Sequence, residues 1–167
     1  MRQNRIVKVK WLISNKLGLV VYTVCPIKGK IESIKSNLSR IGGIITVSSE
    51  CYPTQEEIIE LEQANINWIH VPIDLLEVPR NINLTLKVAE FIDELNSSNK
   101  AVFIMCTGDC FLGKVLAMAY FLTKGFPFDT ASELVLSPTE LKKLKKEKMF
   151  FKYLKFMEAF KQKQLAF

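Results

Sequence analysis

The stretch that decides the fold is AVFIMCTGDCFLGKVLAMAYFLTKG, residues 101–125. It opens on an uninterrupted apolar run at residues 101–105 with polar flanks, which is typical of a central β-strand covered on both faces. A short loop follows at residues 106–112, and the pattern then predicts a helix at 113–124 that ends at Gly125. This strand, loop and helix predict the centre of an α/β domain.

The rest of the chain alternates strand and helix patterns around this unit. The predicted strands span residues 5–12, 17–24, 44–47 and 67–73, and the predicted helices span 31–41 (ended by Gly42-Gly43), 84–95 and 129–135. Another helix is predicted to begin at Pro53, where Thr54 and Glu57 have the spacing of a capping box. Alternation of this kind predicts an α/β sandwich in which helices flank a mostly parallel central sheet. Ligands of such sheets bind beyond the carboxyl ends of the strands, where the loop at 106–112 lies.

The composition is that of one ordinary globular domain. The chain has 167 residues, of which 49% are hydrophobic and 24% charged, and this length predicts a single domain over residues 1–167. No apolar run reaches the roughly 18 residues that span a bilayer. The N-terminal segment lacks the apolar stretch and cleavage site of a signal peptide. We therefore expect a cytoplasmic protein with no membrane partner.

A basic helix is expected near the C-terminal end. Ser137, Pro138 and Glu140 combine an N-cap, a proline at N1 and a glutamate at N3, and they predict one long amphipathic helix over residues 139–164. Residues 139–163 hold nine lysines and three glutamates, a net of +6 that equals the net charge of the whole chain. A solvated helix face is the plainest interpretation, and the alternatives are nucleic acid, an acidic partner or a lipid surface. The face predicted to pack on the domain consists of Leu141, Leu144, Phe151, Leu154 and Met157.

The cysteines give no metal-binding pattern. Cys25, Cys51, Cys106 and Cys110 are scattered and accompany a single histidine, His70, so neither a structural metal nor another cofactor is expected. His70 lies in an alternating strand pattern and is predicted to be a packing residue. The composition, rich in Ile and Lys, suits a thermophile, and thermophiles are the organisms in which intracellular disulfides occur.

The loop at residues 106–112 has the local chemistry of an anion site. Backbone N–H groups at the start of a helix point into such a loop, and the helix dipole adds partial positive charge. The same donors would stabilise a thiolate at Cys106, the first residue of the loop. A cysteine-dependent phosphatase works in this way, with a thiolate that attacks phosphorus and an aspartic acid that protonates the leaving oxygen.

The sequence resembles the protein-tyrosine and dual-specificity phosphatases, whose signature is HCxxGxxR. The match runs without a gap over residues 101–135, and IGGIITVSSE at 41–50 is similar to an upstream strand of that family. WIHVPID at 68–74 resembles the strand that leads into the family's general-acid loop, and Pro79 resembles that loop's proline. In all, the resemblance covers about residues 11–160 and implies a phosphatase-like α/β/α sandwich.

The resemblance also assigns roles to residues. It implies that Cys106 is the nucleophile and that Asp74 is the general acid, with Glu77 as an alternative acid and capping of a turn as the other role of Asp74. The residues that would surround a bound phosphate group are Thr107, Gly108, Asp109, Cys110, Phe111, Leu112, Gly113 and Lys114.

The departures from the signature fall where the chemistry takes place. Met105 replaces the histidine, Asp109 the glycine and Leu112 the arginine, and Gly113 replaces the following Ser or Thr. An arginine makes bidentate bonds to phosphate oxygens that a leucine cannot make. Loss of one such donor costs on the order of 10²–10³ in rate. The resemblance therefore implies a pseudophosphatase that binds a phosphorylated protein or another anionic ligand.

Three alternatives stand beside this interpretation. The first is an active phosphatase that uses Cys106 and Asp74, with Lys114 or a lysine from elsewhere in place of the missing arginine. The second is a nucleic-acid-associated protein that binds through the basic C-terminal helix. The third is a nucleotide P-loop, because residues 108–115 fit GxxxxGK[ST] except at Val115; the late position of the motif in the chain argues against it.

Cys106 distinguishes two states of the loop. In an open phosphate cradle Cys106 is reduced, partly exposed and low in pKa. In a collapsed loop the thiol is buried, inert or bonded to Cys110. The collapsed state is predicted, because no arginine holds the loop open and because Phe111 and Leu112 gain by burying apolar surface.

Overall fold

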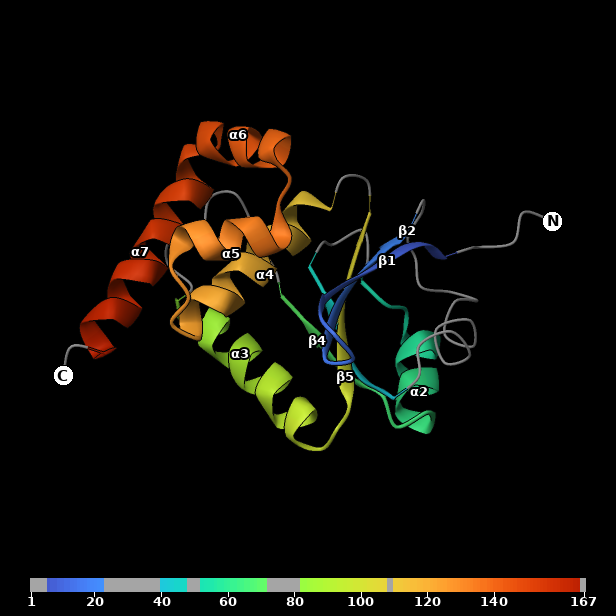
Figure 1. Ribbon diagram of the computed structural model, residues 1–167. Helices are drawn as coiled ribbons and strands as arrows, with labels where there is room; N and C mark the ends of the chain where they lie inside the picture. Colours follow the sequence, from blue (N-terminus) through green and yellow to red (C-terminus); the bar gives the residue numbers. More distant parts are fainter. Residues whose placement is uncertain (1–5, 23–39, 48–51, 72–81, 108–109, 166–167) are drawn as a thin grey trace. The chain divides into compact units, whose positions relative to one another are not determined.

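The computed structural model describes residues 6–22, 40–47, 52–71, 82–107 and 110–165 (Figure 1). The chain divides into two compact units, the first made of residues 1–72 and 91–113 and the second of residues 73–90 and 114–167. The single domain over residues 1–167 stays a prediction from the sequence.

A five-stranded sheet forms the centre of the first unit. Its strands are β1 (Ile6–Ile13), β2 (Leu17–Tyr22), β3 (Ile41–Thr46), β4 (Asn67–His70) and β5 (Ala101–Thr107). They lie in the order β1-β2-β5-β3-β4, and β1 is antiparallel to β2 while all other neighbours are parallel. This topology confirms the predicted, mostly parallel sheet, and it places β5 at the centre.

The apolar run at the start of β5 is buried on both faces, as the sequence predicts. Phe103 and Met105 belong to a cluster with Ile44 and with Leu61 of α2 (Gln55–Gln63). The opposite face lies against α3 (Ile82–Ser97), where a Cβ atom on Gly43 would come within 2.5 Å of Leu95 Cδ1. Side chains alternate between the faces of a strand, so helices on both sides can bury the same strand.

The Gly42-Gly43 pair has a different role from the one predicted. The sequence predicts that this pair ends a helix at residues 31–41, most of which lies outside the described residues. In the structure both glycines belong to β3. A Cβ atom added at Gly42 would lie 2.5 Å from Lys100 Cβ, and one added at Gly43 would collide with side chains of α3. The absence of side chains at these two positions therefore lets β3 pack closely against Lys100 and α3.

The predicted helix signals are confirmed at both ends. Thr54 begins α2 with a full capping box to Glu57, and Ser137 does the same with Glu140. Gly125 has a φ of +93°, as expected for the glycine that follows a helix. The helices beyond β5 are α4 (Phe111–Thr123), α5 (Phe128–Val135), α6 (Pro138–Lys146) and α7 (Lys148–Leu165).

The single helix predicted over residues 139–164 is wrong. The chain forms α6 and α7, with a break at Glu147, whose ψ of 78° is not helical. The apolar pattern explains the break. In one continuous helix the stripe through Leu144 would continue at Lys148, Phe151 and Lys155. The break shifts the phase, so that α7 buries Phe150, Tyr153, Leu154 and Met157, with Phe150 in place of the predicted Phe151.

Two phenylalanines of α7 provide a matched test of this packing. Phe150 is fully buried, whereas Phe156 is 53% exposed. We expect Phe150→Ala to lower the free energy of unfolding by about 3–5 kcal/mol and Phe156→Ala to change it by less than about 0.5 kcal/mol. Urea unfolding measures both. Equal losses for the two variants would contradict the assignment of the buried face.

Candidate functional site

Two cysteines mark the point where β5 gives way to α4. Cys106 is the last but one residue of β5, pairs in register with Val21 of β2 and is 3% exposed. Cys110 directly precedes α4, is 2% exposed and has a φ of +60°. A non-glycine residue rarely adopts this left-handed conformation, so the chain turns sharply at Cys110 before the helix begins.

Cys106 and Cys110 are joined by a disulfide. Their Cα atoms lie 5.2 Å apart, within the roughly 7 Å that a disulfide can bridge. The Cys106 sulfur lies 3.7 Å from the carbonyl oxygen of Val20. At these two cysteines the structure agrees with the collapsed state predicted from the sequence, in which the sulfur is buried and bonded. Gly108 and Asp109 lie outside the described residues.

Gly113 has a packing role that the sequence resemblance does not show. A Cβ atom at this position would lie 3.0 Å from Cys110 Sγ, 3.1 Å from Cys106 Sγ and 3.2 Å from Ile104 Cγ2. These distances are shorter than ordinary van der Waals contact. The first turn of α4 therefore lies directly on the disulfide because residue 113 has no side chain, and a Ser or Thr here would require the sulfurs to move.

Lys114 has a partner within the second unit. Its ammonium forms an ion pair with Oε2 of Glu140, while Oε1 of the same carboxylate accepts the Ser137 backbone N–H at 3.0 Å. Burial raises the pKa of Glu140, but the Lys114 and Ser137 interactions outweigh burial and hold that pKa below its ordinary value. Lys114 is expected from the sequence to supply positive charge to an anion site, and in the structure Glu140 balances that charge.

The structure describes part of the remaining loop. The backbone of Thr107 belongs to β5, and Phe111 and Leu112 are half-buried in the first turn of α4. This helix begins two residues before the predicted Gly113. The expected acids Asp74 and Glu77 lie outside the described residues, as does Pro79.

A second polar cluster lies at the carboxyl ends of β3 and β4, and no motif in the sequence marks it. Trp68 Nε1 donates to Thr46 Oγ1 at 3.0 Å, and Thr46 Oγ1 lies 2.8 Å from His70 Nδ1. Tyr52 contacts both aromatic rings edge-on. An indole only donates, so the buried Thr46 hydroxyl accepts from Trp68, and the imidazole tautomer of His70 sets the direction of the Thr46–His70 bond. Burial lowers the pKa of His70, and these contacts suit the packing role predicted for this residue.

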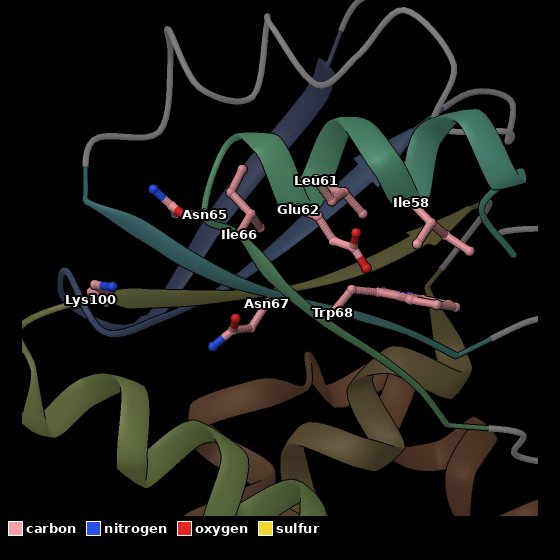
Figure 2. Close-up of a pocket in the computed structure, with 8 residues that line it drawn as sticks. All are labelled: Ile58, Leu61, Glu62, Asn65, Ile66, Asn67, Trp68 and Lys100. Atoms are coloured by element: carbon pink, nitrogen blue, oxygen red, sulfur yellow. The ribbon is translucent and has the colours of Figure 1, made fainter.

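A pocket of about 620 Å³ lies between the end of α2 and the edge strand β4 (Figure 2). Ile58 and Leu61 of α2 line it together with Trp68, and Glu62 points toward the indole ring. Lys100 lies at the other end of the pocket. Seven of its eight lining residues lie between Ile58 and Trp68, and Lys100 from the turn before β5 completes the wall.

The described residues show neither a metal centre nor a membrane span. They contain no group of three His, Cys, Asp or Glu side chains that could hold a metal ion. No helix in the same part of the chain has the length and apolar character to cross a membrane. The cytoplasmic location and the expected lack of cofactor stay predictions from the sequence.

Comparisons with known proteins identify the fold. No family model matches the sequence, and no curated protein matches it. Solved structures do match. A mouse protein described as a dual specificity phosphatase, complexed with zinc tungstate, has a TM-score of 0.65 and 14% identity over 94% of this chain and 90% of its own.

Two further structures agree with this match. Tk-PTP in its active form has a TM-score of 0.61 and 15% identity over 93% of this chain and 99% of its own. A Shewanella putrefaciens protein described as a phosphatase has a TM-score of 0.64 and 15% identity over 95% of this chain and 92% of its own. The chain therefore has the fold of the protein-tyrosine and dual-specificity phosphatases. The fold expected from the sequence resemblance is confirmed.

The state of the two cysteines can be measured on one tryptic peptide, because Ala101–Lys114 holds both and has no internal cleavage site. When unreduced protein is treated with iodoacetamide and then digested, we expect this peptide to carry no label, since both sulfurs are in the disulfide. After reduction and unfolding it should take two labels. Labelling of either cysteine in folded, unreduced protein would contradict the disulfide.

The Cys110→Ser variant tests whether the reduced site is open. The Cys106 thiol is then free but still buried, so we expect slow labelling at pH 6 that phosphate and vanadate do not alter. Rapid labelling blocked by vanadate would show that an anion cradle survives around the thiolate.

The Lys114–Glu140 pair predicts a pH dependence of stability. The pKa of Glu140 is held below its ordinary value of 4.5, so its carboxylate adds stability above that value, and this stability is lost as the pH falls through the lowered pKa. Glu140→Gln retains an acceptor for Ser137 but removes the charge. We expect it to cost about 0.5–1 kcal/mol at pH 7 and nothing once the pH is below the lowered pKa.

Urea unfolding at a series of pH values measures this difference. Glu133→Gln, which neutralises an exposed carboxylate on α5, is the matched control. A cost of Glu140→Gln that stays constant across the whole pH series would show that the charge of Glu140 contributes nothing.

Proposed function

We propose that this protein is a pseudophosphatase: it keeps the phosphatase fold, lacks efficient catalysis, and acts by binding a phosphorylated protein or another anionic partner. The observation that carries the proposal is the disulfide at Cys106, the residue that aligns with the family's nucleophile. Attack on phosphorus requires a thiolate, and a sulfur in a disulfide is not one.

The surroundings of Cys106 support the same proposal. Leu112 occupies the signature's arginine position and has no donor for phosphate oxygens. The Lys114 ammonium is neutralised by Glu140. Binding without catalysis remains chemically reasonable, because a helix that begins at Phe111 still presents backbone N–H groups at its first turn.

An active phosphatase is the second candidate, and the position of Cys106 favours it. Reduction would give a thiol at the carboxyl end of β5, just before the first turn of α4, where helix N–H groups lower a thiol pKa. In that case Asp74 would serve as the acid. The test must therefore include reduced protein.

Hydrolysis of p-nitrophenyl phosphate separates the two candidates. We expect wild-type protein, with and without reductant, to match Cys106→Ser within about twofold, because electrostatic clamping of the transition state is missing. Reductant-dependent turnover at least tenfold above Cys106→Ser, and lost in Asp74→Asn, would establish an active phosphatase instead. Thermal unfolding with and without inorganic phosphate reports binding in the absence of catalysis.

A further inference from the structure

The outer face of α7 carries a line of aromatic and basic side chains that the fold does not use. Lys152, Phe156, Phe160 and Lys163 follow one another at steps of four, four and three residues, which places them along one side of a helix. Phe156 is 53% exposed, both lysines are exposed and Phe160 is half-buried. We call these four residues the outer stripe.

The outer stripe is distinct from the face of α7 that packs. Phe150, Leu154 and Met157 fill the buried face of the same helix. The rings of Phe156 and Phe160 stack on each other instead, with centroids 6.4 Å apart and planes inclined by 25°. The helix thus holds two large aromatic rings near-parallel at its surface, although folding of the core does not require them there.

The charge around the outer stripe is positive. Residues 139–163 carry the whole net charge of the chain, +6. Glu158 is the acidic residue of α7, and its carboxylate is occupied by the Phe128 backbone N–H and by Lys155. These interactions hold the pKa of Glu158 below its ordinary value even though burial acts to raise it. The carboxylate is therefore directed to α5 and Lys155 and does not neutralise Lys152 or Lys163.

We propose that the outer stripe binds single-stranded nucleic acid, with bases stacked on Phe156 and Phe160 and with phosphates held by Lys152 and Lys163. Stacking on exposed rings flanked by basic side chains is the usual way in which proteins hold single strands without sequence preference. The two lysines are eleven residues apart, roughly 16 Å along the helix axis. The rings therefore lie between two phosphate contacts to the same nucleic-acid strand.

The chemistry of α7 favours a nucleic acid over a lipid surface. A helix that lies in a membrane interface needs a broad apolar face to bury, and the broad apolar face of α7 is already buried within the protein. The two phenylalanine rings between lysines have little apolar area to insert into a bilayer. Their order, lysine, ring, ring, lysine, matches the alternation of phosphates and bases along a nucleic-acid strand. The proposal rests on residues of the second unit and does not depend on the state of Cys106.

Fluorescence anisotropy with a labelled oligo(dT) of about 20 nucleotides, longer than a site of one helix face, tests the proposal on the full chain. We expect binding that weakens with salt and that is at least tenfold weaker in Phe156→Ala/Phe160→Ala, because two stacking platforms are lost. The matched apolar control is Leu86→Ala/Leu134→Ala, which removes two exposed leucines elsewhere and should bind as wild type does. Unchanged thermal unfolding checks that each variant is folded.

The lysines are tested through the salt dependence. Lys152→Ala/Lys163→Ala should lower the slope of log K against log salt by about 1.4, two contacts at about 0.7 each on a single strand. Lys142→Ala/Lys145→Ala removes the same charge from α6 and should change the slope less. Equal effects of the two lysine pairs, or equal binding by the phenylalanine and leucine variants, would overturn the proposal. Binding to phosphatidylserine vesicles without binding to oligo(dT) would overturn it in favour of a lipid surface.

Discussion

The complete burial of Ala101–Met105 in β5 is the constraint on which the rest of the first unit depends. This strand pairs with β2 along one edge and β3 along the other, and Ala101–Met105 have no exposed surface. A strand held on all four sides cannot shift in register without exposing apolar groups or breaking backbone hydrogen bonds. The position of its carboxyl end is therefore set by the sheet. Cys106 lies at that end, and its position does not depend on the residues of the following loop.

At the carboxyl end of β5, the described residues are held together by a disulfide and by close packing. A phosphate cradle needs a thiolate, a cation and open space around converging N–H groups. In this chain the sulfur of Cys106 is bonded to Cys110, residue 112 is an apolar leucine, and Gly113 allows the first turn of α4 to lie against the two sulfurs. The ammonium of Lys114 is balanced by Glu140. These features are compatible with one another, because the disulfide, the leucine and the glycine all allow apolar groups to be buried at the start of α4.

In the second unit, α7 serves two purposes on two faces. Phe150, Leu154 and Met157 supply buried apolar surface, and the outer stripe with its lysines faces solvent. The break at Glu147 makes this possible, because it brings the apolar positions of α7 into phase with its buried face. A long uninterrupted helix would have directed Lys148 and Lys155 toward the core, at a high cost in desolvation.

The sequence by itself determined the features whose cause is local. The capping boxes at Thr54 and Ser137 depend on a partner three residues away, and the central position of β5 follows from its uninterrupted apolar run. Only the tertiary structure decided the rest. The pairing of Lys114 with Glu140 and the choice of Phe150 over Phe151 for burial depend on where distant segments meet. No local sequence pattern predicts where those segments meet, because the packing of the whole unit sets their positions.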